Sequence, residues 1–227
     1  MTGLLTRLEA FNRKERFFVF AQATDNPRFT LGAEFRAELG SKLGIEIPEN
    51  ASAYVDYHLD WLHAAIVLDR EPEEAEFRQN RTPEGAKIVS TGNQEDIDLL
   101  DAFDGGPSTF LILVEAKAFS PWLRSQMDSK SKRLAMLFGC EETAADAAIQ
   151  PRFCVLSPTE PTAGALGAET WPKWMLLSDS ESSLRFAWLE LRVPRGRMRV
   201  QGLNDAGKPS HERTRWRALS IIASDSD

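Results

Sequence analysis

Two strand-like stretches of the sequence carry acidic side chains, and one of them adds a lysine. The run Phe110 to Val114 consists of large apolar and β-branched residues, which is typical of a strand buried on both faces. Glu115 follows this run directly, and Lys117 comes two residues later. Asp98 lies in the other strand-like segment, upstream. A buried strand that ends in a carboxylate and an ammonium group needs a physical reason, and catalysis is one.

The connection between the two strands predicts a hairpin that brings these charges together. Residues 104–107 read Asp-Gly-Gly-Pro, and such residues supply positive φ and then end a strand ladder. With the turn centred between the third and fourth of them, antiparallel pairing sets Asp98 opposite Glu115 and Asp96 opposite Lys117. Two carboxylates at roughly 5 Å repel each other unless a cation shares them.

A hard divalent cation is the ligand that suits this carboxylate pair. Mg²⁺ takes oxygen ligands, usually one or two protein carboxylates, and leaves its other positions to water and substrate phosphate. Lys117 projects from the same strand face as Glu115, where it can orient or deprotonate the attacking water or stabilise developing negative charge. We therefore predict a Mg²⁺ or Mn²⁺ site at Asp98 and Glu115, with Lys117 as a catalytic residue.

Asp98 followed by Glu115-Ala116-Lys117 resembles the PD-(D/E)XK nuclease superfamily, in which a strand Asp precedes (Asp/Glu)-x-Lys on the next strand. The resemblance covers about residues 53–157, although Ile97 stands where the superfamily's name has Pro. It implies an α/β fold with a restriction-endonuclease-like α-β-β-β-α-β core around a mixed sheet. It also implies phosphodiester hydrolysis, with a metal held by Asp98, Glu115 and the carbonyl of Ala116.

The same resemblance points to two helical residues. The superfamily often places an acid on the helix before the core strands, and a Gln or basic residue on the helix after the Glu-x-Lys strand. On a helix expected over about residues 51–68, Asp60 is the candidate for a further metal ligand, with Glu74 and Glu76 as alternatives. On the later helix, Gln126 is the candidate catalytic residue.

Length and patterning predict one domain with three parts. A chain of 227 residues, 42% hydrophobic and 27% charged, can bury a core of its own. We expect an N-terminal helical part over 1–50, a core over 51–158 with its first strand near 86–90, and a β-rich C-terminal extension over 159–227. The extension should add antiparallel strands to the α/β core.

Charge is distributed unevenly along the chain. The net charge is −7, yet residues 185–217 hold eight Arg and one Lys against three acids, a local charge of +6 that leaves −13 for the rest. Odd-numbered arginines share one face of each strand in this segment, and that face can follow a phosphate backbone. The residues predicted to contact DNA are Arg197, Arg199 and Arg215, together with Lys130 and Lys132 of the later helix.

Several function classes are disfavoured. No apolar stretch approaches the roughly 18 residues that span a bilayer, so we expect a cytoplasmic protein without a membrane partner. No Gly-rich phosphate loop or nucleotide-binding fingerprint occurs, which argues against a nucleotide cofactor. The two cysteines have no spacing for zinc or a disulfide framework. Homodimerisation is compatible with the sequence.

We therefore predict a Mg²⁺-dependent endodeoxyribonuclease that hydrolyses DNA. One alternative is that Lys117 pairs with Asp96 across the ladder as an ordinary ion pair where the sheet reaches solvent. A second alternative keeps the fold but not the chemistry, as a non-catalytic module that binds a nucleic acid or an acidic protein. Metal binding separates the nuclease from the module, since a module has no need for Asp98 and Glu115 close together.

Overall fold

A computed structural model describes residues 3–70, 90, 92, 95–142, 146–177, 185–194, 196–211 and 213–220. Its helices are α1 (Gly3–Phe11), α2 (Glu15–Ala23), α3 (Ala33–Leu43), α4 (Leu59–Arg70), α5 (Arg124–Phe138) and α6 (Ala163–Leu166), with short 3-10 helices η1 (Ala168–Thr170) and η2 (Lys173–Met175). Its strands are β1 (Ser52–His58), β2 (Asp96–Asp104), β3 (Thr109–Ala116), β4 (Ile149–Ser157), β5 (Ala187–Glu190), β6 (Met198–Leu203) and β7 (Arg215–Ser220).

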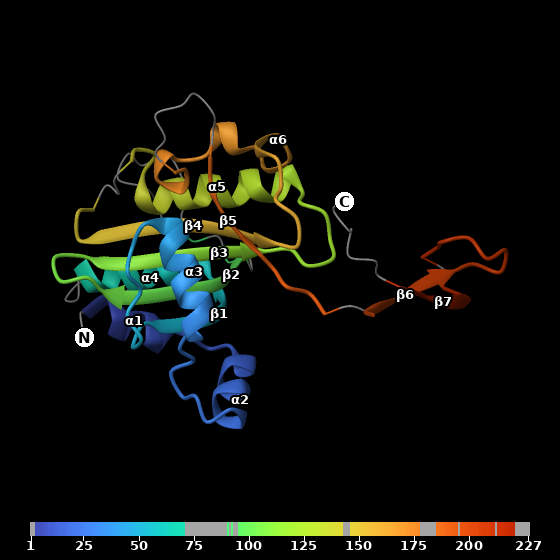
Figure 1. Cartoon of the computed structure of the whole chain (residues 1–227), viewed down its shortest axis with the longest axis horizontal. Helices are drawn as coiled ribbons and strands as arrows, with labels where there is room; N and C mark the ends of the chain where they lie inside the picture. The colour runs from blue at the N-terminus through green and yellow to red at the C-terminus, as the bar shows by residue number, and fades with distance from the viewer. Residues whose placement is uncertain are drawn as a thin grey trace.

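The first five strands form one mixed sheet in the order β1-β2-β3-β4-β5. β2 runs antiparallel to both of its neighbours, whereas β3, β4 and β5 are parallel to one another. The carboxyl ends of β3, β4 and β5 therefore lie along the same edge of the sheet. β6 and β7 form a separate two-stranded antiparallel sheet that stands apart from the body (Figure 1).

Helices pack on both faces of the five-stranded sheet (Figure 1). On one face, Leu8 of α1, Leu62 of α4 and Leu134 of α5 join a core with Leu113 of β3. On the other face, Leu39 and Leu43 of α3 pack on Phe103, Ile112 and Val114 of β2 and β3. Because β3 is covered on both sides, its run from Phe110 to Val114 is continuously apolar and does not alternate with polar residues.

The hairpin between β2 and β3 has the predicted register. Asp104 pairs with Thr109 and Leu99 pairs with Val114, which centres the turn between Gly106 and Pro107. The turn requires a positive φ of 88° at Gly106, a conformation that glycine adopts without steric cost. The register prediction is therefore confirmed, and it places Asp98 and Glu115 at the matching ends of the two strands.

The prediction of a helix over residues 51–68 is wrong for its first half. Ser52–His58 is strand β1, and α4 begins only at Leu59. Tyr54 and Tyr57 are aromatic residues that suit a strand, and both are buried where β1 pairs with β2. The strand expected near 86–90 lies outside the described residues except for Ser90, which belongs to no regular element.

The α/β class with a mixed sheet and a C-terminal antiparallel extension is confirmed. From α3 to β4 the element order is α-β-α-β-β-α-β, so α4 lies between the first and second strands of the expected α-β-β-β-α-β series. The restriction-endonuclease-like topology itself stays a prediction. None of the described helices is both long enough and apolar enough to cross a bilayer.

Candidate active site

Asp98 and Glu115 lie side by side where the ladder between β2 and β3 ends. The last backbone pair of the ladder is Leu99 with Val114. Beyond it, the Asp98 carboxylate takes the place of a backbone acceptor, since its Oδ2 accepts a hydrogen bond of 2.6 Å from the Ala116 N–H. Glu115 is only 5% exposed. The two carboxylates that the sequence predicted to be neighbours are therefore close together.

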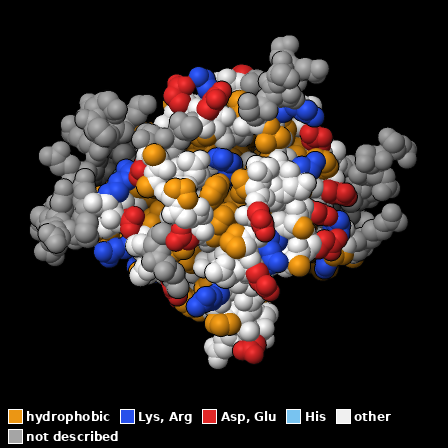
Figure 2. All heavy atoms as spheres, turned by 60° about the vertical axis from the view of Figure 1, so that its left-hand side comes forward, with side chains coloured by type: hydrophobic (Ala, Val, Ile, Leu, Met, Phe, Trp, Pro, Cys, Tyr) orange, Lys and Arg blue, Asp and Glu red, His pale blue; other side chains and the backbone are white. Residues whose placement is uncertain are grey.

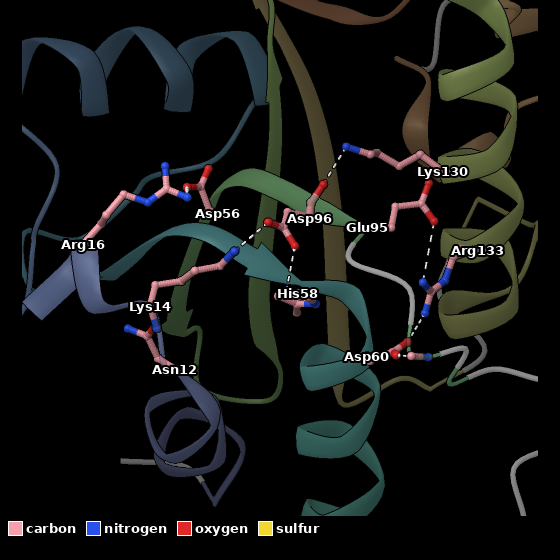
Figure 3. Close-up of polar contacts among 11 residues, drawn as sticks. Asn12, Lys14, Arg16, Asp56, His58, Asp60, Glu95, Asp96, Lys130 and Arg133 are labelled. Atoms are coloured by element: carbon pink, nitrogen blue, oxygen red, sulfur yellow. Dashed lines mark hydrogen bonds and ion pairs between the residues drawn. The ribbon is translucent and has the colours of Figure 1, made fainter.

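Two lysines bind the Glu115 carboxylate. Lys117 Nζ lies 3.3 Å from Oε1, and Lys130 Nζ donates a short hydrogen bond to Oε2. Lys130 comes from α5 and also donates to the backbone carbonyl of Asp96 at 2.6 Å (Figure 3). Glu115 and both of these lysines therefore form one compact cluster of opposite charges.

The environment of Glu115 acts on its charge in two opposite ways. Burial raises the pKa of this carboxyl group above its ordinary value, because the charged form loses hydration. The ammonium of Lys130 opposes that shift, and the neighbouring Asp98 carboxylate adds to it. The net direction is upward, so the carboxylate holds its charge here at a free-energy cost that a further cation would reduce.

Asp96 anchors the outer side of this cluster. Its carboxylate receives Lys14 Nζ at 2.6 Å and His58 Nε2 at 3.2 Å (Figure 3). The simple ion pair of Lys117 with Asp96, which the sequence also allowed, is absent from the described contacts, since Lys117 binds Glu115 and Asp96 contacts Lys14 and His58. Asp96 therefore fixes both the strand end and, through its carbonyl, Lys130.

Asp60, expected as a further metal ligand, has a different partner. Its carboxylate pairs with Arg133 of α5, and its Oδ2 accepts a hydrogen bond of 2.8 Å from Gly92 N–H. Arg133 Nη1 also lies 3.6 Å from Glu95 (Figure 3). In this arrangement Asp60 ties the start of α4 to α5. The alternatives Glu74 and Glu76 lie outside the described residues.

The other candidates fall in three places. Gln126 and Lys132 are exposed on α5, whereas Lys130, expected at the phosphate-facing surface, is 7% exposed and bound to Glu115. Arg197, Arg199 and Arg215 are exposed on the separate sheet or just before it. Lys130 differs from expectation because α5 turns it toward the sheet, and the helix sequence alone did not reveal that face.

The donor set fits a hard divalent cation in part. Asp98, Glu115 and the Ala116 carbonyl offer oxygen atoms at one strand end, which suits Mg²⁺ with water in its remaining positions. Within the described parts of the chain, no group of three or more His, Cys, Asp or Glu side chains could hold a metal. Two carboxylates agree with Mg²⁺ chemistry, and the ammonium of Lys130 now neutralises one of them.

Sequence reasoning missed the residues that hold this site in place. Lys14, His58 and Lys130 are separated by long stretches of chain, and all three contact Asp96. The one available signal was Lys130 itself, which stood among basic residues and so was assigned to the surface.

No family model, curated protein or solved structure matches this chain.

Proposed function

We propose that this protein is a Mg²⁺-dependent nuclease that hydrolyses phosphodiester bonds in DNA. The observation that supports the proposal is the convergence of Asp98, Glu115 and Lys117 at the paired ends of β2 and β3. That convergence rests on the hairpin register and on direct contacts, so it is more specific than the short Glu-x-Lys pattern. The restriction-endonuclease-like topology and cytoplasmic location belong to the same proposal.

The residues of the site divide the chemistry among them. Asp98, Glu115 and the Ala116 carbonyl would hold the divalent cation, which when bound neutralises phosphate charge and makes a water more acidic. Lys117 extends from the strand end beside Glu115, where its ammonium can orient the attacking water and stabilise negative charge on the phosphate oxygens. Lys130 keeps the Glu115 carboxylate ionised and oriented toward the strand end.

One observation favours a second candidate function, a non-catalytic nucleic-acid or protein-binding module. Lys130 supplies the positive charge that a metal would otherwise bring to Glu115. A module of this kind would be stable without any divalent cation and would bind its partner equally well in its absence. The experiment that separates the two candidates is therefore a test of metal binding and hydrolysis together.

We expect Mg²⁺ or Mn²⁺ to support cleavage of plasmid DNA and to raise the melting temperature by a few degrees, because a ligand of the folded state stabilises it. Asp98→Asn, which keeps an acceptor for the Ala116 N–H, should lose both effects. Lys117→Met should keep the thermal shift and lose cleavage by at least about 100-fold.

Matched controls are Asp104→Asn at the exposed opposite end of β2 and Lys173→Met on the surface, both of which should behave as the wild type. Cleavage retained by Lys117→Met would show that the Glu-x-Lys match is coincidental. The absence of both cleavage and a metal-induced shift in the wild type would favour the binding module.

A further inference from the structure

The β6–β7 ribbon, which we call the arm, is built as a structure of its own. Its two strands pair with each other, from Met198 with Ser220 to Leu203 with Arg215, and among the described residues neither pairs with a strand of the body. Residues 204–214 connect the two strands, and a turn at the start of this connection has Gly207 N–H donating to the carbonyl of Asn204 at 2.9 Å. A two-stranded ribbon without further packing is marginally stable in water. Binding to a partner molecule would therefore stabilise the arm.

The register divides the arm into two unlike faces. Directly opposed residues of an antiparallel pair share a face, so Arg199, Arg215 and Arg217 lie together with Gln201. Gln201 Oε1 accepts from Arg217 Nε at 3.0 Å and from Nη2 at 2.9 Å, which holds that guanidinium on its face. Among the described residues, none of the three arginines forms an ion pair. The arginine face is therefore available to an anionic partner.

The other face of the arm is apolar. Met198, Val200 and Trp216 lie on it and are 63%, 72% and 70% exposed. The side chain of Arg213 reaches over Gly202 of this face, within 2.6 Å of where a Cβ would stand. Trp216 and Val200 nevertheless line one pocket together with Arg213 and Arg215, so basic groups also border the aromatic ring. Because a site for stacked single strands combines an aromatic platform with basic groups in one groove, this pocket is the competing site that the Trp216 control tests.

The arm leaves the body from the edge that carries the candidate active site. Glu115 and Lys117 lie at the carboxyl end of β3, and this end shares an edge with the carboxyl end of β5. The chain runs from Glu190 at the end of β5 to the arm through residues 191–197, which can span at most about 25 Å when extended. Figure 1 shows the arm on the side of the body to which β5 leads. One ligand can therefore contact both the arm and the site.

We propose that the arm lies in a groove of duplex DNA with its arginine face toward the DNA, and that the substrate of the candidate site is consequently double-stranded. This inference rests on the proposed nuclease function and names the form of its substrate. The major groove is about 12 Å wide and admits a two-stranded ribbon. Arginines on the inserted face would contact phosphates and base edges, and the local charge of +6 reverses the charge of an otherwise acidic chain.

The test measures binding of the full chain to a labelled duplex of about 20 base pairs and to one of its single strands, in EDTA so that nothing is cleaved. The variant is the triple change Arg199→Gln, Arg215→Gln and Arg217→Gln. One control is Trp216→Ala on the opposite face. A second is Arg192→Gln, outside the arm, whose guanidinium pairs with Glu34 and Glu38 of α3.

The wild type should bind duplex more tightly than single strand. The triple variant should lose on the order of 10- to 100-fold in duplex affinity at about 150 mM salt. Its slope of log K against log salt should fall by about 2 to 3, since each phosphate contact contributes about 0.9. Both controls should keep the affinity and the slope of the wild type.

An unchanged slope and affinity in the triple variant would overturn the proposal. So would a preference for single strand that Trp216→Ala abolishes, which would assign base stacking to the apolar face. Because binding is measured without metal, this result is separate from the nuclease test. If the wild type cleaves DNA and the arm variant binds duplex normally, only the proposal for the arm is refuted. If the chain binds duplex through the arm but never cleaves it, only the nuclease proposal is refuted.

Discussion

Glu115 is a buried carboxylate that depends on its cationic neighbours. Of the two lysines that bind it, Lys130 is nearly buried and holds a fixed position through the carbonyl of Asp96. Lys117 is more exposed and is free to act on a substrate at the strand end. We therefore infer different roles for the two ammonium groups. Lys130 stabilises and orients the Glu115 carboxylate, and Lys117 acts on the substrate.

Lys130→Met should destabilise the metal-free protein by about 3–5 kcal/mol, because the buried Glu115 carboxylate loses its main counter-charge. Urea denaturation in EDTA measures this change. Under the nuclease proposal, Mg²⁺ should then raise the melting temperature of the variant more than that of the wild type, since the cation no longer competes with an ammonium.

The control for that prediction is Lys132→Met, an exposed lysine on the same helix, which should change the unfolding free energy by no more than about 0.5 kcal/mol. Equal stability of the Lys130 and Lys132 variants would show that the pair with Glu115 contributes nothing to folding.

The positions of Asp98, Glu115 and Lys117 were predictable because they depend on local information. Strand alternation and a turn of known type set which residues oppose each other, and the observed register agrees. The partners of Asp96 were not predictable, because Lys14 and His58 reach it through the packing of α1, β1 and β2. Contacts of this kind depend on how elements pack, and no short sequence pattern encodes them.

At the scale of elements, strand β2 carries Asp101, a carboxyl group whose buried surroundings disfavour its charged form. Asp101 is completely buried on the side of the sheet that α3 covers, and neither of its carboxylate oxygens has a hydrogen-bond partner among the described residues. Burial raises the pKa of Asp101 to about 7, and the nearby Arg36 only partly opposes the shift. Below about pH 7 the folded state therefore favours the protonated form of Asp101.

This arrangement predicts a specific dependence of stability on pH. The pKa of Asp101 is higher in the folded than in the unfolded chain, so the folded state binds more protons and the unfolding free energy falls as pH rises from about 4 to about 7. A shift of this size corresponds to a loss on the order of 4 kcal/mol, which is complete above pH 7. Asp101→Asn should remove that part of the fall and be the more stable protein at pH 8.

Denaturant unfolding at pH 5 and pH 8 tests the Asp101 prediction through the difference between wild type and variant. Asp104→Asn is the control, since Asp104 is exposed on the same strand and Asn keeps an acceptor for the Gly106 N–H. A difference that does not change with pH would mean that Asp101 is ionised in the folded state or paired through water.

The error over Ser52–His58 has a physical origin at the same scale. The sequence from Tyr54 to Ile66 is apolar at spacings that suit a helix, so the strand and helix merge into one pattern. Strand β1 forms because β2 supplies its hydrogen-bond partners from residues far along the chain. A positive φ of 50° at Asp56 interrupts the strand near its end, and Arg16 holds the Asp56 carboxylate at 3.0 Å. Long-range pairing of this kind overrides local propensity.

At the scale of the whole molecule, charge is separated between the body and the arm. Acidic and basic side chains are interspersed over the face of the body drawn in Figure 2. Of the α5 cations predicted to meet phosphate, Lys130 is committed to an acid and Lys132 is exposed. The alternation of residues in β6 and β7 predicted that Arg199, Arg215 and Arg217 share a face, whereas Arg213, of the same odd parity, precedes β7 and reaches over Gly202 on the other face.

The body and the arm should also separate in their stability. Neither arm strand joins the five-stranded sheet, and most arm side chains are exposed. Arg192, which binds α3, precedes the arm. A chain that ends after Pro194 should therefore melt within about 2 °C of the full chain and keep its Mg²⁺-induced shift, because 1 kcal/mol corresponds to about 2–4 °C at this size.

A chain that ends after Phe186 provides the matched comparison, since it also loses β5. Ala187 and Leu189 of β5 are buried against Cys154 and α3 in the second core, so this shorter chain should unfold at a much lower temperature or fail to fold. Scanning fluorimetry and duplex titration of both truncated chains separate the two roles. If loss of residues 195–227 alone lowers the melting temperature by more than about 5 °C, the arm is part of the folding unit, and the loss of DNA affinity in that chain could no longer be assigned to the arginine face.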